Sequence, residues 1–192
     1  MGKVKVYSDL LSFTSPSLNV NRESVLASLP VYTRILDIDN EKLKDVIINH
    51  RNEFPISESS NVEAWHSSYK THRINPHFQP YIDFILREIK DILFLKHERL
   101  APTLYFRDFW AIMYENSDYT ISHEHFPCPY AASYYVEAEV NCSPIQFDGV
   151  HTLKIIPQSG MLMVWPGILR HSVPPTNSKR TVLSMNLLVQ LP

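Results

Sequence analysis

The sequence has few cysteines, little net charge and no long hydrophobic run, and each of these absences excludes a class of protein. Only Cys128 and Cys142 are present, so no disulfide framework is expected and the cytoplasm is the expected location. No apolar run reaches the length of a membrane span, and the amino terminus lacks the apolar core of a signal peptide. A formal charge of -2 gives no general attraction to nucleic acid or anionic membranes. We therefore expect no nucleic-acid or membrane partner.

The composition is that of an ordinary globular protein. The chain has 192 residues, of which 44% are hydrophobic and 20% charged, enough for one buried core. We predict a single domain over 1–192, divided into an arm at 1–30, a helical support region at 31–100 and a jelly-roll core at 101–192. A short edge strand near residues 3–7 can pair with a second chain, so a homodimer is a possible assembly.

Two stretches in the first half carry apolar residues at helical spacing. After a strand at 31–38, the first helix begins near Asp37 and ends near Phe54-Pro55, because the residue before a proline disfavours helical geometry. The second begins at Asn75-Pro76, a capping residue followed by a proline tolerated in the first turn, and runs to about His97. The expected buried faces are Leu43, Val46, Ile47 and His50 in the first helix, and Phe78, Ile82, Ile85, Ile89 and Ile92 in the second.

From Pro102 onward the chain consists of short runs rich in β-branched and aromatic residues, separated by polar or proline-bearing turns. We expect strands at 103–106, 109–114, 131–140, 145–147, 152–156, 161–165 and 181–189. Helices followed by about seven strands predict an α+β fold. The strands would form a double-stranded β-helix, or jelly roll, with the helices packed on one face.

The motif most indicative of chemistry is His123-Glu124-His125. Alternate side chains of an extended chain point to the same face, so the two imidazoles point one way and Glu124 the other. His171, which follows an apolar strand and a Pro-Gly turn, can supply a third imidazole. Three imidazoles on one face of a metal ion leave its opposite face open. The chain has no His-Glu-x-x-His or Cys-x-x-Cys, which argues against a metalloprotease helix and a structural zinc site.

The other six histidines have no partner at ligand spacing. We expect surface or hydrogen-bonded positions for all of them: His50, His66, His72, His77, His97 and His151.

Arg180 helps to distinguish between metal chemistries. It opens an alternating strand on which Ser184 and Asn186 share its face. A guanidinium that faces the interior is costly to bury without an anion, and a carboxylate ligand meets that need through two parallel hydrogen bonds. The alternative is an arginine that is solvated or paired with an acidic residue of the chain.

Together these residues resemble the pattern of the Fe(II)/2-oxoglutarate dioxygenases. In prolyl-hydroxylase-like members, a Tyr is followed by a His nine residues on, an acid two further, and then a late His and an Arg. Tyr114, His123, His171 and Arg180 fall on these places. The chain is more closely similar to the 2-oxoglutarate/Fe(II) oxygenases found in bacteria and phages. That similarity covers the Trp65-His66-Ser67 element, the helix after it, the His-x-His pair, the Tyr134-Tyr135-Val136 strand and the late His-to-Arg segment.

The resemblance implies a hydroxylase that consumes molecular oxygen and 2-oxoglutarate and releases succinate and carbon dioxide. Its substrate would be a small molecule or a peptide, which the sequence does not identify. The far carboxylate of 2-oxoglutarate would pair with Arg180 and accept a hydrogen bond from Tyr114. The residues that the resemblance assigns are His123, His125 and His171 for Fe(II), and Arg180, Tyr114, Ser184 and Asn186 for 2-oxoglutarate.

One departure from the superfamily pattern is His125, where an Asp or Glu is usual. Three neutral ligands leave the metal site more positive by one unit, which changes metal affinity and redox tuning. Glu124 or Asp148 remains as a source of a carboxylate ligand, although alternation disfavours the first and the second lies in a turn. Two other functions stay open: a cupin-type metalloenzyme that does not use 2-oxoglutarate, and a non-catalytic jelly-roll binding module.

Overall fold

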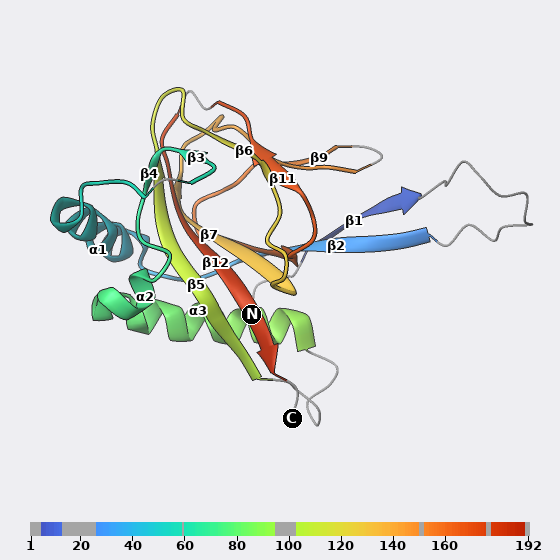
Figure 1. Ribbon diagram of the computed structural model, residues 1–192, viewed down its shortest axis with the longest axis horizontal. Helices are drawn as coiled ribbons and strands as arrows, with labels where there is room; N and C mark the ends of the chain where they lie inside the picture. Colours follow the sequence, from blue (N-terminus) through green and yellow to red (C-terminus); the bar gives the residue numbers. More distant parts are fainter. Residues whose placement is uncertain are drawn as a thin grey trace, which may run out of the picture.

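The protein consists of two antiparallel β-sheets with helices on the outer face of the larger sheet (Figure 1). The computed structural model describes residues 5–12, 26–58, 60–94, 103–149, 152–175 and 178–190. The large sheet has the strand order β1-β2-β10-β7-β12-β5-β4, and the small sheet has the order β3-β6-β11-β8-β9. This arrangement confirms the predicted α+β double-stranded β-helix.

The strands of the large sheet include the longest ones in the described chain. Their bounds are β1 Lys5–Ser12, β2 Leu26–Ile35, β4 Trp65–His66, β5 Thr103–Tyr114, β7 Tyr130–Ala138, β10 Met161–Pro166 and β12 Arg180–Gln190. The strands of the small sheet are shorter. Their bounds are β3 Val62–Glu63, β6 Tyr119–His123, β8 Ile145–Phe147, β9 Leu153–Ile155 and β11 His171–Val173.

The helices pack where their apolar stripes predict. Helix α1 (Asn40–Glu53) buries Leu43, Ile47 and His50. Asn75 caps the second helical segment as expected, since its side chain accepts a hydrogen bond from the backbone N–H of His77 at 2.9 Å. A 3-10 turn, η1 (Pro76–Phe78), precedes α3 (Gln79–Phe94), and the short α2 (Thr71–Ile74) lies just before it. The buried isoleucines of α3 are Ile82, Ile85, Ile89 and Ile92. The predicted end near His97 lies outside the described residues, and no described helix is long and apolar enough to cross a bilayer.

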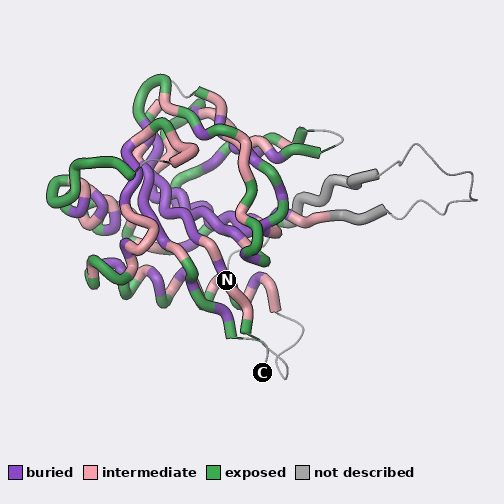
Figure 2. The backbone as a smooth tube through the Cα atoms, viewed as in Figure 1, coloured by how far each residue is buried: buried purple, intermediate pink, exposed green. Residues whose placement is uncertain are grey.

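Buried residues form two clusters, one on each face of the large sheet. Leu183, Met185 and Leu187 of β12 pack toward the helices, whereas Val182 packs toward the small sheet. Figure 2 shows that the central strands of the large sheet are the most continuously buried part of the backbone. Because β12 alternates between the two clusters, Arg180, Ser184 and Asn186 face the space between the sheets, as the sequence predicts.

The predicted break between two strands at residues 107–108 is wrong. The runs 103–106 and 109–114 form one continuous strand, β5, which pairs with β12 along its whole length. The register shifts at Asn186, which lies opposite Asp108, while Leu187 lies opposite Phe106, so Arg107 has no partner in the ladder. This β-bulge explains the polar interruption that made one strand look like two.

The division between an arm and a support region at residue 30 is also wrong. It falls inside β2, which begins at Leu26 and pairs with β1 on one side and β10 on the other. The expected edge strand is therefore β1, from Lys5 to Ser12, and Lys3 lies outside the described residues. Figure 1 shows β1 and the start of β2 extending away from the rest of the protein.

Candidate metal centre and adjoining cavity

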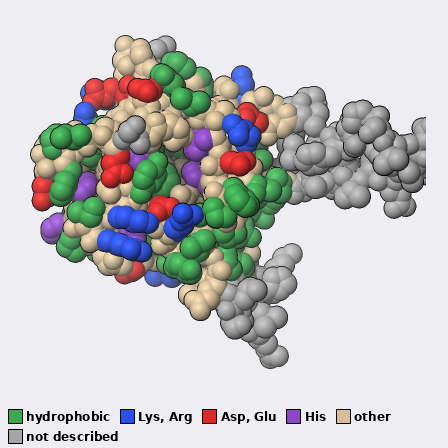
Figure 3. Space-filling view, viewed as in Figure 1, with side chains coloured by type: hydrophobic (Ala, Val, Ile, Leu, Met, Phe, Trp, Pro, Cys, Tyr) green, Lys and Arg blue, Asp and Glu red, His purple; other side chains and the backbone are tan. Residues whose placement is uncertain are grey.

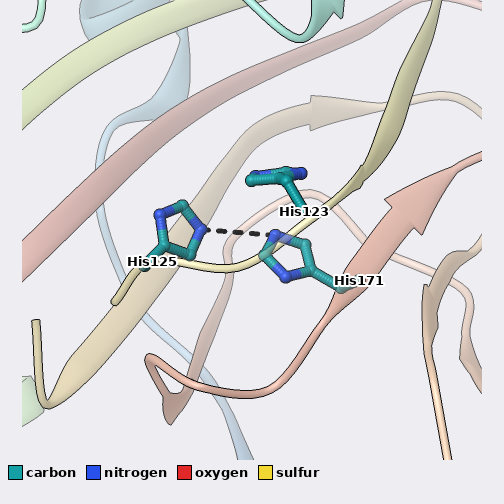
Figure 4. A group of neighbouring side chains, drawn as sticks. All are labelled: His123, His125 and His171. Carbon is teal, nitrogen blue, oxygen red and sulfur yellow. Dashed lines mark hydrogen bonds between the residues drawn. The ribbon is translucent and has the colours of Figure 1, made fainter. Parts of the chain in front are cut away.

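Three imidazoles converge between the two sheets (Figure 4). His123 is the last residue of β6 and lies opposite His171, the first residue of β11, in their antiparallel ladder. One ring nitrogen from each of His123, His125 and His171 lies within 4.8 Å of the other two. The Nε2 atoms of His125 and His171 are 3.3 Å apart. Because metal–nitrogen bonds are about 2.1 Å long, neighbouring ligand nitrogens need to be about 3 Å apart, and this pair already meets that requirement.

His125 reaches this cluster by a route that strand alternation does not describe. β6 ends at His123, and His125 lies in the turn that follows, where its backbone N–H donates to the carbonyl oxygen of Gly167 at 2.7 Å. A Cβ atom on Gly167 would lie 1.9 Å from the carbonyl oxygen of Cys128, so only glycine allows these two turns to touch. The contact between the turns positions His125 beside His171.

Backbone carbonyls fix the tautomers of two of the three histidines. His123 Nδ1 lies 2.9 Å from the carbonyl oxygen of Ile121, and His171 Nδ1 lies 3.1 Å from that of Leu169. A carbonyl oxygen only accepts hydrogen bonds, so each Nδ1 carries the proton and each Nε2 presents a lone pair. A cation is therefore the species that best suits the space between the rings.

Burial keeps all three imidazoles neutral. It is the main cause that lowers the pKa of His123, and it lowers the pKa of His125 to about 3, with His123 as the next cause. The pKa of His171 lies well below its ordinary value because the ring is buried and next because His123 and His125 are close. Neutral imidazole is the form that binds metal, so the cluster is ready for a metal ion at neutral pH.

Neither carboxylate that the sequence left open belongs to the described ligand group. Asp148 instead accepts a hydrogen bond from the Ser122 hydroxyl at 2.7 Å and lies 3.9 Å from Arg170. Glu124 is exposed to solvent. Within the described chain, the candidate ligand set is therefore three histidines and no acid.

A cavity of about 630 Å³ adjoins the histidines and extends between the sheets. This volume lies within the range typical of small-molecule sites. Figure 3 shows histidine side chains at the surface near the middle of the face in view, above a group of Lys and Arg side chains. Phe126, Trp110 and Trp165 line the cavity near the histidines, and Tyr114, Tyr135 and Arg180 line it further along β5, β7 and β12.

Arg180 is buried in the cavity wall, with only 1% of its surface exposed. Its Nη1 donates to the carbonyl oxygen of Ser143 at 3.0 Å, but its buried Nε has no hydrogen-bond partner. The guanidinium carbon lies 4.3 Å from the centre of the Tyr114 ring and 5.9 Å from that of Tyr135. No described acidic side chain forms an ion pair with it, so a solvated or acid-paired arginine is not what the structure contains. A buried cation with an unused donor favours an anionic ligand.

The other residues that the sequence singled out also line the cavity. The hydroxyl groups of Tyr114 and Thr120 share a hydrogen bond of 2.6 Å. Ser184 contacts Ser133 across the sheet, with 3.4 Å between the hydroxyl oxygens. Asn186 donates from Nδ2 to Asp108 at 3.0 Å. All four predicted cavity residues, counting Arg180, thus face one space.

Sequence reasoning missed several residues of the cavity wall. Asp108 and Trp110 lie on the face of β5 that carries Tyr114, so period-two alternation counted back from Tyr114 would have found them. His66 was expected to be exposed or hydrogen-bonded, and that is wrong. Its ring is fully buried, stacks on Trp110 at 5.7 Å and has no hydrogen-bond partner on either nitrogen. His97 and His151 lie outside the described residues.

The lowered histidine pKa values predict a loss of stability in acid for protein held free of metal by a chelator. Between pH 6.5, the ordinary histidine value, and the lower folded values, the unfolded chain binds protons that the folded protein does not. The free energy of unfolding therefore falls as the pH falls, by up to about 1.4 kcal/mol per pH unit for each such histidine. For His125 this window extends down to about pH 3.

Urea unfolding at several pH values measures this dependence, and His125→Asn isolates one contribution. The variant should show a shallower decline in stability between pH 6.5 and pH 4 than the unsubstituted protein, because asparagine does not titrate. Equal slopes for the two proteins would contradict the expected burial of a neutral His125.

Comparisons with known proteins identify the fold. Neither the protein-family models nor the curated protein sequences give a match. Among solved structures, a prolyl hydroxylase from Trichoplax adhaerens, in complex with a hypoxia inducible factor peptide fragment, matches with a TM-score of 0.61 at 13% identity. The match covers 79% of this chain and 77% of that one.

Two further solved structures match over similar lengths. The viral collagen prolyl hydroxylase of Paramecium Bursaria Chlorella virus-1, solved as a 2OG complex, has a TM-score of 0.56 at 17% identity over 81% of this chain and 94% of its own. A non-heme alpha ketoglutarate dependent carbocyclase from nogalamycin biosynthesis has a TM-score of 0.63 at 10% identity, over 84% of this chain and 79% of that one. Identities this low establish a shared fold and not a shared reaction.

Proposed function

We propose that this protein, which has the fold of the Fe(II)/2-oxoglutarate oxygenases, is itself a 2-oxoglutarate- and Fe(II)-dependent oxygenase that hydroxylates its substrate. One observation carries the proposal. Three neutral imidazoles and a buried arginine without an acidic partner among the described residues line the same cavity. A metal site alone fits many enzymes, but this arginine also requires an anion in the cavity.

In this proposal, His123, His125 and His171 hold the iron through their Nε2 atoms. Their rings come from one side, which leaves coordination positions toward the cavity for a cosubstrate and oxygen. When bound, iron and 2-oxoglutarate supply the oxidising chemistry, in which molecular oxygen is consumed and 2-oxoglutarate becomes succinate and carbon dioxide. The carbonyls of Ile121 and Leu169 keep two of the imidazoles in the tautomer that this role needs.

Arg180 is assigned to the far carboxylate of 2-oxoglutarate. A charge-assisted pair with the guanidinium would supply the acceptor that its Nε lacks. Tyr114 can donate its hydroxyl hydrogen to the same carboxylate if Thr120 is the donor in their shared hydrogen bond. Ser184 and Asn186 follow Arg180 along β12 and line the same cavity.

The reaction on the substrate is assigned by resemblance to the prolyl hydroxylases. The wall near the histidines is aromatic, with Trp110, Phe126 and Trp165, and the charged residues Lys70 and Arg107 also line the cavity. Such a wall suits a small molecule or a peptide segment that presents a C–H bond to the metal. Because a carbocyclase also has this fold, hydroxylation has to be tested on the products.

Turnover of 2-oxoglutarate without a substrate is the first test of this function. Protein loaded with Fe(II) and supplied with oxygen and ascorbate should form succinate slowly, and omission of iron should stop it. Metal binding without succinate formation, or without any effect of 2-oxoglutarate on the metal, would favour the cupin-type enzyme. Absence of metal binding would favour a binding module.

A further inference from the structure

A chain of polar contacts along the cavity wall leads to His125. Lys70 Nζ lies 2.6 Å from Asp108 Oδ1, and Asn186 Nδ2 donates to Asp108 Oδ2 at 3.0 Å. The β-bulge at Arg107 places Asp108 opposite Asn186 in the ladder, and Lys70 Nζ also donates to the carbonyl oxygen of Arg107 at 2.8 Å. Two strands and the segment before α2 thus hold the Asn186 amide in place.

The carboxylate of Asp108 determines which way the Asn186 amide points. An ionised carboxylate only accepts hydrogen bonds, so the group that faces Asp108 must be the amide NH₂. The amide oxygen, Oδ1, therefore faces away from Asp108. It is buried and has no hydrogen-bond partner among the described residues. An unsatisfied buried acceptor of this kind costs about 1–3 kcal/mol, so its position needs an explanation.

His125 needs a hydrogen-bond acceptor for its Nδ1 atom if it is to bind a metal through Nε2. Its Nε2 faces His171 at 3.3 Å, so if Nε2 binds a metal the proton must sit on Nδ1. Backbone carbonyl oxygens accept hydrogen bonds from Nδ1 of His123 and of His171, but none accepts from Nδ1 of His125 within the described chain. Asn186 and His125 line the same cavity. Burial is the main cause that lowers the pKa of His125, and a side-chain interaction with Asn186 and the charge of Asp108 partly oppose it. The Asn186 Oδ1 atom nevertheless forms no hydrogen bond to a described residue in this structure.

We propose that Asn186 is a positioning residue whose Oδ1 accepts a hydrogen bond from His125 Nδ1 and so holds His125 in the tautomer that binds metal through Nε2. Asp108 and Lys70 keep the amide in the required orientation. This inference rests on the proposed function, since it takes His125 as a metal ligand. Asp108 would then act on the all-histidine site indirectly, through Asn186 and His125. In the dioxygenase pattern, by contrast, an acidic residue binds the metal directly.

Binding of Co(II) alone, with no 2-oxoglutarate present, tests the inference. Asn186→Ala should weaken Co(II) binding about 10–100-fold, the usual effect of losing a group that orients a metal ligand. Asp108→Asn should have a smaller effect in the same direction, because the new amide can either donate to or accept from Asn186. Ser133→Ala, a change elsewhere in the same wall, is the matched control and should leave Co(II) affinity unchanged.

The visible spectrum of the fully loaded protein separates positioning from a general structural effect. Loss of the hydrogen bond should change the Co(II) ligand-field bands of Asn186→Ala at saturating metal, whereas a merely destabilised protein would give the normal bands once loaded. Unchanged affinity and bands in both variants would overturn the inference, as would a defect confined to 2-oxoglutarate binding. If the unsubstituted protein bound no Co(II), the proposed function itself would fail, which is a different result.

Discussion

His171→Ala is expected to abolish metal binding while the fold persists. The imidazole is one of three candidate ligands, and because its Nδ1 is engaged by the Leu169 carbonyl, its Nε2, which lies 3.3 Å from Nε2 of His125, is the nitrogen left for a metal. Removal of a ligand should weaken binding by more than the roughly 10–100-fold that follows from removing a group that only orients one. Iron content after anaerobic loading, and a Co(II) titration, measure the loss.

A matched histidine provides the control for this substitution. His77 is exposed and lies in η1, outside the residues that line the cavity, so His77→Ala should bind metal normally. Circular dichroism and the thermal midpoint of His171→Ala show whether the fold remains. A folded His171→Ala protein with normal iron occupancy would reject the ligand assignment.

Arg180→Met is expected to weaken 2-oxoglutarate binding strongly and metal binding very little. Methionine can still pack on Tyr114, but it leaves a carboxylate buried without its partner. Loss of one member of such a pair costs about 3–5 kcal/mol. That cost corresponds to a loss of affinity of roughly 150-fold to several thousandfold. An anaerobic titration of the Fe(II)-loaded protein with 2-oxoglutarate, followed by the visible charge-transfer absorption of the chelate, measures it.

Arg107→Met distinguishes a specific pair from general positive charge. Arg107 lines the same cavity but is 47% exposed and lies 3.7 Å from Asp108, so its replacement should change 2-oxoglutarate affinity only slightly. Equal losses in the two variants would show that net charge attracts the cosubstrate. Unchanged affinity in Arg180→Met would remove Arg180 from the proposed site.

The sequence predicted the elements whose patterns are local. The isoleucine stripe of α3 and the alternation that turns Arg180, Ser184 and Asn186 toward the cavity depend only on helical and strand periods, and both are confirmed. The candidate ligands were predicted from residue type and spacing. Their convergence is confirmed as well, because His123 and His171 start from paired strand positions.

Features that depend on contacts between distant segments were not predictable. The bulge in β5 exists only relative to β12, so the sequence of β5 alone looked like two strands. His125 owes its place to a turn that packs on Gly167, and His66 owes its burial to Trp110 on the neighbouring strand. The same limit hid the chain from Lys70 through Asp108 to Asn186, whose members are far apart in sequence.

A crystal structure of the protein with Mn(II) and a non-reacting analogue of 2-oxoglutarate would reveal the proposed metal and cosubstrate sites together. We expect one ion bound to Nε2 of His123, His125 and His171, and a chelating analogue whose far carboxylate contacts the guanidinium of Arg180. An ion bound elsewhere, or an analogue whose carboxylate does not reach Arg180, would contradict it.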